Sequence, residues 1–298
     1  MKDERSEKRI ETKTSRTAEW TCLSRAVSSF EVEPHYRSDD SLASKLVPAG
    51  IMALARTRIG MAIFKRCAAS KGIYEYVIAR TKYIDAAFRD APQNRFEQIV
   101  IFGAGFDTRA LRFQEDIAST QIFELDVPTT QNAKIRRYEE RGLTVPANLH
   151  FVPMDFDRQP IRERLSQSGF RIGSRGLFIL EGVLMYLLPS SVVTTFQTLE
   201  AIAGTGSLVV FDYVRASVLR GERTLYGEAG ASEAVKNVNE QWTFGLEPED
   251  VESFLSRYEF KLHDHQDASG LERLYFTGRD GTVGHVNGTH CIVTAERV

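Results

Sequence analysis

Hydrophobic residues form short runs in the middle of the chain, and each run is followed by a segment with helical periodicity. The runs are rich in β-branched and aromatic residues without polar alternation, which is typical of strands buried on both faces of a parallel sheet. Strand and helix alternate five times at βαβ spacing, which predicts a doubly wound, Rossmann-like α/β sheet. The predicted strands are residues 98–102, 121–126, 148–153, 176–181 and 207–212.

Helical periodicity also precedes the first strand, and it predicts helices over residues 17–30, 41–47, 49–69 and 71–90. After the fifth strand, a polar segment dotted with glycine is predicted to be an insertion or lid. A helix over 248–257 and a hairpin-like pair of strands, 260–265 and 290–295, would close the sheet. The predicted organisation is a flexible tail (1–16) and one domain (17–298) made of a helical cap (17–95), a core (96–213), the insertion (214–247) and C-terminal helix and strands (248–298).

Composition narrows the possible partners. The 298 residues carry a net charge of −2, so the chain has no overall positive field that would attract nucleic acid. The three cysteines are far apart, which predicts neither a disulfide framework nor a metal cluster and fits a reducing cytoplasm. The start of the chain does not resemble a signal peptide, and no apolar run approaches the length of a membrane span. We therefore expect a cytoplasmic protein with no nucleic-acid or membrane partner.

A glycine or an acidic residue stands at the carboxyl end of each of the first four predicted strands. Gly103 and Gly105 form a tight turn after the first strand, where the missing side chains allow a ligand to approach the backbone. Asp126 ends the second strand, Asp155 follows the third and Glu181 ends the fourth. A single acidic residue in such a place could simply cap the next helix. Several at one edge of one sheet indicate a ligand site.

The turn favours a sulfonium cofactor over a dinucleotide. The spacing from Gly105 to Asp126 suits a carboxylate that accepts hydrogen bonds from ribose, as in both kinds of site. Thr108 stands where the dinucleotide fingerprint has its third glycine. Phe106 and Asp107 occupy the turn, and the acid would repel a pyrophosphate. We therefore expect S-adenosylmethionine rather than NAD.

Several motifs together resemble one family. They are Arg80-Thr81 with Asp85, Gly103-Ala-Gly-Phe-Asp-Thr-Arg109, Glu124-Leu-Asp126, Asp155, and Glu181-Gly-Val-Leu-Met-Tyr-Leu187. This set resembles the leucine carboxyl methyltransferase family, with its bacterial branch of small-molecule O-methyltransferases. The resemblance covers about residues 17–212. It implies a class I methyltransferase sheet, mostly parallel with an antiparallel C-terminal strand, and an N-terminal helical cap.

The resemblance also implies roles for individual residues. Arg80 would hold the carboxylate of the cofactor's methionine part, Gly103 would form the turn beneath it and Asp126 would bind the ribose. A guanidinium can pair with a carboxylate through two hydrogen bonds, although Arg80 could instead lie on a solvated helix face. Asp155 and Phe156 would contact the adenine, and Glu181 would lie beside the amino acid part of the cofactor.

The acceptor side is less well defined by sequence. Tyr186 is the main candidate for contacting the acceptor, with Arg109 and Trp242 as weaker candidates, but Tyr186 could equally be a core aromatic. None of the six histidines lies in the motifs. His263 and His265 alternate on one strand, yet no third ligand accompanies them at a suitable spacing, so we expect a surface strand and no metal.

These observations favour an S-adenosylmethionine-dependent O-methyltransferase that acts on a carboxylate or hydroxyl of a small organic molecule. A protein C-terminal carboxyl methyltransferase is the alternative, because the family's protein-directed members methylate a C-terminal leucine. An NAD-dependent oxidoreductase and a non-catalytic cofactor-binding module are less favoured.

Overall fold

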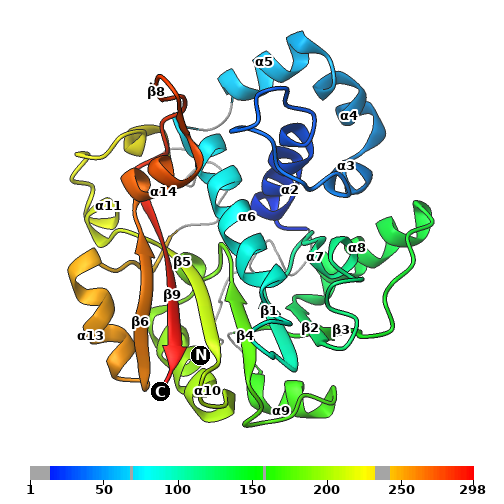
Figure 1. Ribbon diagram of the computed structural model, residues 1–298, viewed down its shortest axis with the longest axis vertical. Helices are drawn as coiled ribbons and strands as arrows, with labels where there is room; N and C mark the ends of the chain where they lie inside the picture. The colour runs from blue at the N-terminus through cyan, green and yellow to red at the C-terminus, as the bar shows by residue number, and fades with distance from the viewer. Residues whose placement is uncertain (1–13, 68–69, 157–158, 232–241) are drawn as a thin grey trace, which may run out of the picture.

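The protein folds around one seven-stranded sheet (Figure 1). The computed structural model describes residues 14–67, 70–156, 159–231 and 242–298. The strands of the sheet, in chain order, are β1 (Gln98–Phe102), β2 (Gln121–Asp126), β3 (Leu149–Pro153), β4 (Gly176–Leu180), β5 (Leu208–Val214), β6 (Phe260–Gln266) and β9 (His290–Arg297).

The strand order is β3-β2-β1-β4-β5-β9-β6. The first five strands are parallel, whereas β9 is antiparallel to both β5 and β6. This arrangement confirms the predicted doubly wound sheet, mostly parallel with one antiparallel C-terminal strand, β9. Two elements between β6 and β9 were not predicted: a helix, α14 (Ala268–Tyr275), and a small sheet made of β7 (Thr277–Gly278) and β8 (Gly281–Thr282).

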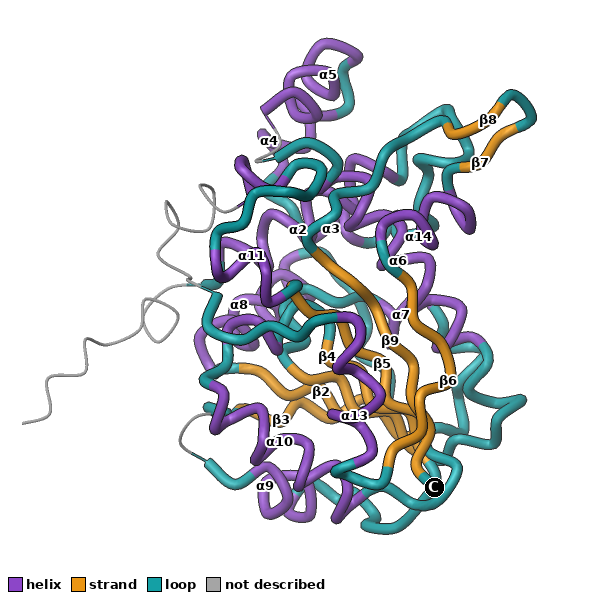
Figure 2. The backbone as a smooth tube through the Cα atoms, turned by 90° about the vertical axis from the view of Figure 1, so that its left-hand side faces the viewer, coloured by secondary structure: helices purple, strands orange, loops and turns teal. Residues whose placement is uncertain are grey.

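Both faces of the sheet are covered, as the unbroken apolar runs predict. Ile99 and Ile101 of β1 belong to one hydrophobic core, and Val100 and Phe102 belong to the other. Figure 2 shows the helical layers on either side of the strands. The first core includes residues of α6 (Ile73–Arg89), α7 (Arg109–Arg112) and α8 (Pro128–Glu140), and the second includes residues of α9 (Ile161–Gln167), α10 (Pro189–Ile202) and α13 (Val251–Ser256).

The N-terminal helices gather above the carboxyl ends of the parallel strands, at the upper right of Figure 1. They are α2 (Arg16–Ser28), α3 (Ala43–Leu46), α4 (Ala49–Ala55) and α5 (Arg58–Cys67). The single helix predicted over 49–69 is wrong, because the chain breaks between α4 and α5. There the Thr57 hydroxyl accepts a hydrogen bond from the Gly60 amide at 2.9 Å, which caps a new helix.

The predicted insertion is described only at its two ends, and residues 232–241 lie outside the described residues. After β5 the chain forms α11 (Ala216–Arg220), and it returns through 242–247 to the short helix η2 (Pro248–Asp250). The Leu246 amide donates to the carbonyl of Val214, so the returning segment lies beside the end of β5. Most of the predicted tail, residues 1–13, also lies outside the description. None of the described helices is both long enough and apolar enough to cross a membrane.

Candidate active site

The turn after β1 requires glycine at two positions. Gly103 and Gly105 have φ angles of 59° and 51°, in the left-handed region. A Cβ on Gly103 would lie 2.7 Å from Val183 Cγ2, and one on Gly105 would lie 3.2 Å from the Cβ of Ala18. Since Ala18 belongs to α2, the cap packs directly on the glycine turn.

Asp126 is held against this turn by backbone hydrogen bonds. Its Oδ2 accepts from the Gly105 amide at 2.5 Å, and its Oδ1 accepts from the Val127 amide at 2.6 Å. Burial raises the pKa of Asp126 to about 6, although both hydrogen bonds act in the opposite direction. The structure therefore brings together two of the predicted site elements, the glycine turn and the acid that ends β2.

Glu181 lies between two arginines. Its Oε2 accepts from Arg109 Nη1 at 2.7 Å, and its Oε1 lies 3.0 Å from Arg80 Nε. The second contact is an ion pair without hydrogen-bond alignment, so both atoms are buried without a hydrogen-bond partner. Burial would raise the pKa of Glu181, but the charges of Arg109 and Arg80 lower it below its ordinary value. Because Arg80 is itself buried, a position on a solvated helix face is excluded.

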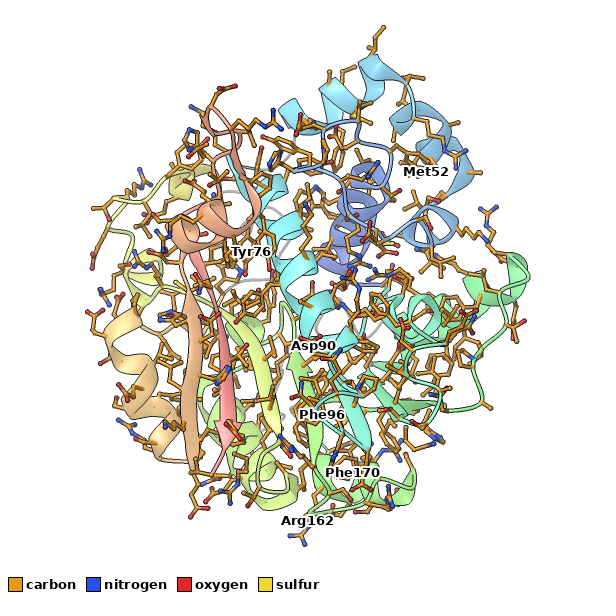
Figure 3. The ribbon with its side chains drawn as sticks, viewed as in Figure 1. Met52, Tyr76, Asp90, Phe96, Arg162 and Phe170 are labelled. Atoms are coloured by element: carbon orange, nitrogen blue, oxygen red, sulfur yellow. The ribbon has the colours of Figure 1, made fainter. Side chains whose placement is uncertain are left out.

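Asp212 is a site residue that sequence reasoning missed. It is fully buried in β5, where its Oδ2 accepts from Arg80 Nη1 and from the Tyr76 hydroxyl, both at 2.7 Å. Its Oδ1 accepts from the Gly182 amide at 2.5 Å, which fixes the turn after Glu181. Tyr76 belongs to α6, and Figure 3 marks its place on that helix. In the sequence, Asp212 could have been recognised as an acidic residue in the otherwise apolar fifth strand.

Arg109 lies at the centre of a larger buried charge network. Besides Glu181, it donates to Asp85 Oδ1 at 2.7 Å and to Asp107 Oδ2 at 2.5 Å. Arg112 donates to both oxygens of the same Asp85 at 2.8 Å. Contacts with three carboxylates place Arg109 inside the protein framework rather than at the acceptor. Within the described chain the network links four arginines and five carboxylates: Arg25, Arg80, Arg109, Arg112, Asp40, Asp85, Asp107, Glu181 and Asp212.

Asp107 differs from its sequence-based interpretation. Burial would raise its pKa, but the adjacent Arg109 guanidinium lowers it to about 2. Its negative charge is thus balanced by a paired cation. Repulsion of a pyrophosphate by Asp107 is therefore a weaker argument than the sequence alone suggested.

Asp155 and Phe156 follow β3, next to the end of β2. The Met154 amide donates to the Asp126 carbonyl at 2.8 Å, so this segment continues alongside Asp126. The Phe156 ring is half-buried, with its centroid 6.1 Å from that of Phe102 in β1. The predicted elements at the ends of β3, β2, β1 and β4 thus lie on four adjacent strands of one sheet edge.

Tyr186 and Trp242 share a small hydrophobic cluster beyond Glu181. Tyr186 ends the short helix η1 (Leu184–Tyr186), and both rings pack against buried Met185 and its neighbours in β5 and α11. Within the described residues the Trp242 indole Nε1 is buried without a hydrogen-bond partner. Two hydrogen bonds hold this segment against η1: the Thr243 amide donates to the Met185 carbonyl, and the Thr243 hydroxyl donates to the Leu187 carbonyl.

His290 is the histidine that lies beside this cluster, and sequence reasoning set it aside. Its ring stacks on Tyr76 with centroids 4.5 Å apart, and the edge of Trp242 meets it at 5.3 Å. Burial lowers the pKa of His290 to about 4, although Asp212 acts in the opposite direction. Elsewhere, His265 hydrogen-bonds the Tyr213 hydroxyl at 2.9 Å and His263 is exposed. The described residues contain no group of three or more potential metal ligands.

Comparison with known proteins identifies the family. The sequence profile described as leucine carboxyl methyltransferase matches residues 18–200, which is more than half of the chain. The chain belongs to the leucine carboxyl methyltransferase family. This confirms the resemblance seen in its motifs.

Two bacterial relatives carry the provisional name S-adenosyl-L-methionine-dependent methyltransferase. YktD of Bacillus subtilis is 28% identical over 222 residues, which cover 72% of this chain and 70% of that protein. A protein of Mycolicibacterium smegmatis is 31% identical over 210 residues, covering 69% and 68%. The chain is therefore an S-adenosylmethionine-dependent methyltransferase, and the predicted enzyme class and cofactor are confirmed. The oxidoreductase and the non-catalytic module are set aside.

Solved structures support the fold of this methyltransferase. A DUF574 family protein from Streptomyces avermitilis aligns with a TM-score of 0.60 at 12% identity, over 97% of this chain and all of that one (100%). A protein from Thermobifida fusca, provisionally titled a methyltransferase, aligns with a TM-score of 0.58 at 13% identity, over 85% and 94%. At such identities the likeness concerns the fold alone.

Proposed function

We propose that this methyltransferase transfers the methyl group of S-adenosylmethionine to a carboxylate or hydroxyl oxygen of a small organic molecule, with a carboxylate preferred. The observation that carries the preference is the placement of His290, which is buried between Tyr76 and Trp242 beside the Tyr186 cluster, so that burial lowers its pKa to about 4. A base this weak would give little help to a phenol, whose proton is held with a pKa near 10. A carboxylate is already ionised at neutral pH and needs no base.

The cofactor's polar groups match the residues at the sheet edge. In this proposal Arg80 holds the methionine carboxylate, and Glu181 lies beside the amino group. Arg80 Nε and Glu181 Oε1, both buried and without a hydrogen-bond partner, would gain one from a zwitterionic ligand. Asp126, beside Gly105, would accept hydrogen bonds from the ribose.

The remaining contacts concern the adenine. Phe156 offers an aromatic face at the end of β1, and Asp155 next to it would accept a hydrogen bond from the adenine amino group. Gly103 and Gly105 keep the turn free of side chains. The proposed cofactor site thus runs along the edge from β3 to β4, across the turn.

For this reaction the protein mainly has to position the acceptor against the methyl group and to exclude water from the site. The cofactor supplies an electrophilic methyl group on a positively charged sulfur. With the cofactor bound, a lone pair of the acceptor oxygen would form the new C–O bond while the electron pair of the C–S bond stayed on sulfur. A carboxylate has no proton to lose, whereas a hydroxyl would release its proton to water. Tyr186 and Trp242 would hold the acceptor in line with the C–S bond. Such orientation can lower the activation barrier by about 7 kcal/mol or more.

Transfer of labelled methyl groups tests the proposal. Purified protein is incubated with methyl-labelled S-adenosylmethionine and, separately, small carboxylic acids, small phenols and peptides that end in leucine. Methyl esters release methanol in alkali whereas methyl ethers do not, so alkaline release separates the two oxygen acceptors. We expect volatile label from small carboxylic acids.

A protein C-terminal carboxyl methyltransferase is a second candidate, favoured by the family's description as leucine carboxyl methyltransferases. Alkali-labile label on the leucine-ended peptides, with none on the small acids, would establish that candidate and contradict the first. Label on no oxygen acceptor of either kind would contradict both.

A further inference from the structure

The helices α4 and α5 expose aliphatic side chains that the described fold leaves uncovered. The exposed fractions are 48% for Ile51, 62% for Leu54, 74% for Ile59 and 53% for Ile63. The two helices contact each other, and each contributes two of the four residues. Figure 2 shows α5 at the top of the molecule, beyond α2 and α3. Exposed aliphatic groups of this kind are typical of interaction surfaces.

The inner side of α5 is attached to the cap, which fixes the outward direction of the exposed residues. Phe64 stacks on Trp20 with centroids 6.3 Å apart and meets Tyr74 edge-on at 5.8 Å. Lys65 forms an ion pair with the nearly buried Glu31. Ile59 and Ile63 occupy the exposed side of the same helix. Their exposure follows from how α5 is seated on the cap.

Charge is segregated in the same region. Residues 41–74 contain six basic residues and no acidic residue, whereas the whole chain has a net charge of −2. The side chains of Lys45, Arg56 and Lys71 are exposed. Lys65 is paired with Glu31, and the other five basic residues leave the sequence segment around α4 and α5 with a net positive charge. The basic residues are Lys45, Arg56, Arg58, Lys65, Arg66 and Lys71.

We propose that the exposed face of α4 and α5, defined by Ile51, Leu54, Ile59 and Ile63, docks on the surface of an anionic lipid membrane. Aliphatic side chains bordered by lysine and arginine are the combination that enters the interface of a bilayer while its cations meet anionic headgroups. A second copy of this chain would bring two cationic faces together, which charge disfavours. The expectation of no membrane partner rested on the lack of a spanning segment, and surface docking requires none.

Vesicle co-sedimentation tests this surface with the full chain. The vesicles are phosphatidylcholine alone, or phosphatidylcholine mixed with phosphatidylglycerol. We expect binding to the anionic vesicles, weaker binding at high salt because screening shortens the reach of the cations, and little binding to the zwitterionic ones. The variant Ile59→Ser removes the most exposed of the four side chains. It should weaken binding about tenfold, the scale of burying one aliphatic side chain.

The matched control is Leu274→Ser on α14, because Leu274 is 55% exposed and lies outside α4 and α5. It should bind anionic vesicles like the native chain, and calorimetry with S-adenosylmethionine should show that both variants are folded. Three outcomes would overturn the proposal: equal binding to both vesicle types, equal loss in the two variants, or a native dimer in solution that Ile59→Ser dissociates. The last would assign the face to a second copy.

Discussion

At the scale of single residues, the central feature is Arg80, whose guanidinium forms ion pairs with carboxylates of the protein itself. Its guanidinium contacts Glu181 and Asp212; Arg80 and Asp212 are buried, and the Glu181 side chain is 10% exposed. A cofactor carboxylate must share this guanidinium with them. The network around Arg80 counts five carboxylates and four arginines within the described residues, and so carries one excess negative charge. S-adenosylmethionine has a net positive charge, whereas its demethylated product is neutral.

Replacing Asp212 by Asn tests this charge balance with little change of shape. The variant removes one negative charge near Arg80, so the cationic cofactor should lose more affinity than the neutral product. Calorimetry should show an approximately tenfold loss for S-adenosylmethionine and a smaller one for S-adenosylhomocysteine, the scale of one Coulombic contact. Glu97→Gln is the control, since it removes the same charge from an exposed site just before β1. Equal losses for the two ligands would contradict the charge argument.

Asp126 should make cofactor binding depend on pH. Burial raises its pKa to about 6, so it takes up a proton as the pH falls through that value. A protonated acid is a poorer acceptor for ribose hydroxyls, so affinity should be nearly full at pH 7 and above and should decline as the pH falls through 6. Between pH 7 and pH 5 the loss should be about tenfold. Titrations in Asp126→Asn should lack this transition, and a transition that persists there would assign it to another group.

At the scale of elements, the turn after β1 is the piece whose geometry matters most. Gly103 combines a positive φ with a close neighbour, because an added Cβ would meet Val183 at 2.7 Å. Gly142 also has a positive φ, of 62°, but a Cβ there would meet nothing within 4 Å. The two glycines thus separate the cost of the backbone conformation from the cost of the clash.

We therefore expect different results from Gly103→Ala and Gly142→Ala. Gly142→Ala should lower the free energy of unfolding by about 1 kcal/mol, because alanine is strained at positive φ. Gly103→Ala should lower it further, and it should also weaken S-adenosylmethionine binding, because Val183 must move. Chemical denaturation and calorimetry on both variants make the comparison. Matching values for the two would show that the turn tolerates a side chain.

The elements also show what a sequence can reveal. Unbroken apolar runs predicted β1 to β5 because strands buried on both faces need no polar side, and βαβ connections placed the carboxyl ends of these strands at one edge of a parallel sheet. The break at Thr57 was missed because it depends on a single local hydrogen bond, from the Gly60 amide to the Thr57 hydroxyl. Asp212 and His290 were missed because their partners, Arg80 and Tyr76, come from α6, far away in the chain. Such pairings appear only when the helix is placed over the sheet.

At the scale of the whole molecule, the cap and the core are joined by buried charges. Arg25 of α2 donates to Asp40 at 2.8 Å and to the carbonyl of Phe106, in the glycine turn, at 2.6 Å. Thr108 donates to the same Asp40 at 2.6 Å. The cap is thus attached at the turn where we place the cofactor. Cap stability and cofactor binding should be linked.

Arg25→Met tests this connection. It removes the 2.8 Å partner of the buried Asp40, leaves that carboxylate with its longer contact to Arg112 at 3.5 Å, and should lower the free energy of unfolding by about 3 kcal/mol. The double variant Arg25→Met/Asp40→Asn removes both charges, keeps an oxygen that can accept from Thr108 and Ala43, and should recover part of that loss. Denaturation curves of the two variants are compared with the native chain. A double variant no more stable than the single one would mean that the lost bond to Phe106, and not the weakened pairing of Asp40, sets the stability.

A crystal structure with S-adenosylhomocysteine tests the central claim most directly, because it shows which side chains contact each part of the ligand. We predict the ligand carboxylate within hydrogen-bond distance of Arg80, the ribose hydroxyls at Asp126 and the adenine beside Asp155 and Phe156. A ligand bound elsewhere, or an Arg80 that still contacts only Glu181 and Asp212, would contradict the account.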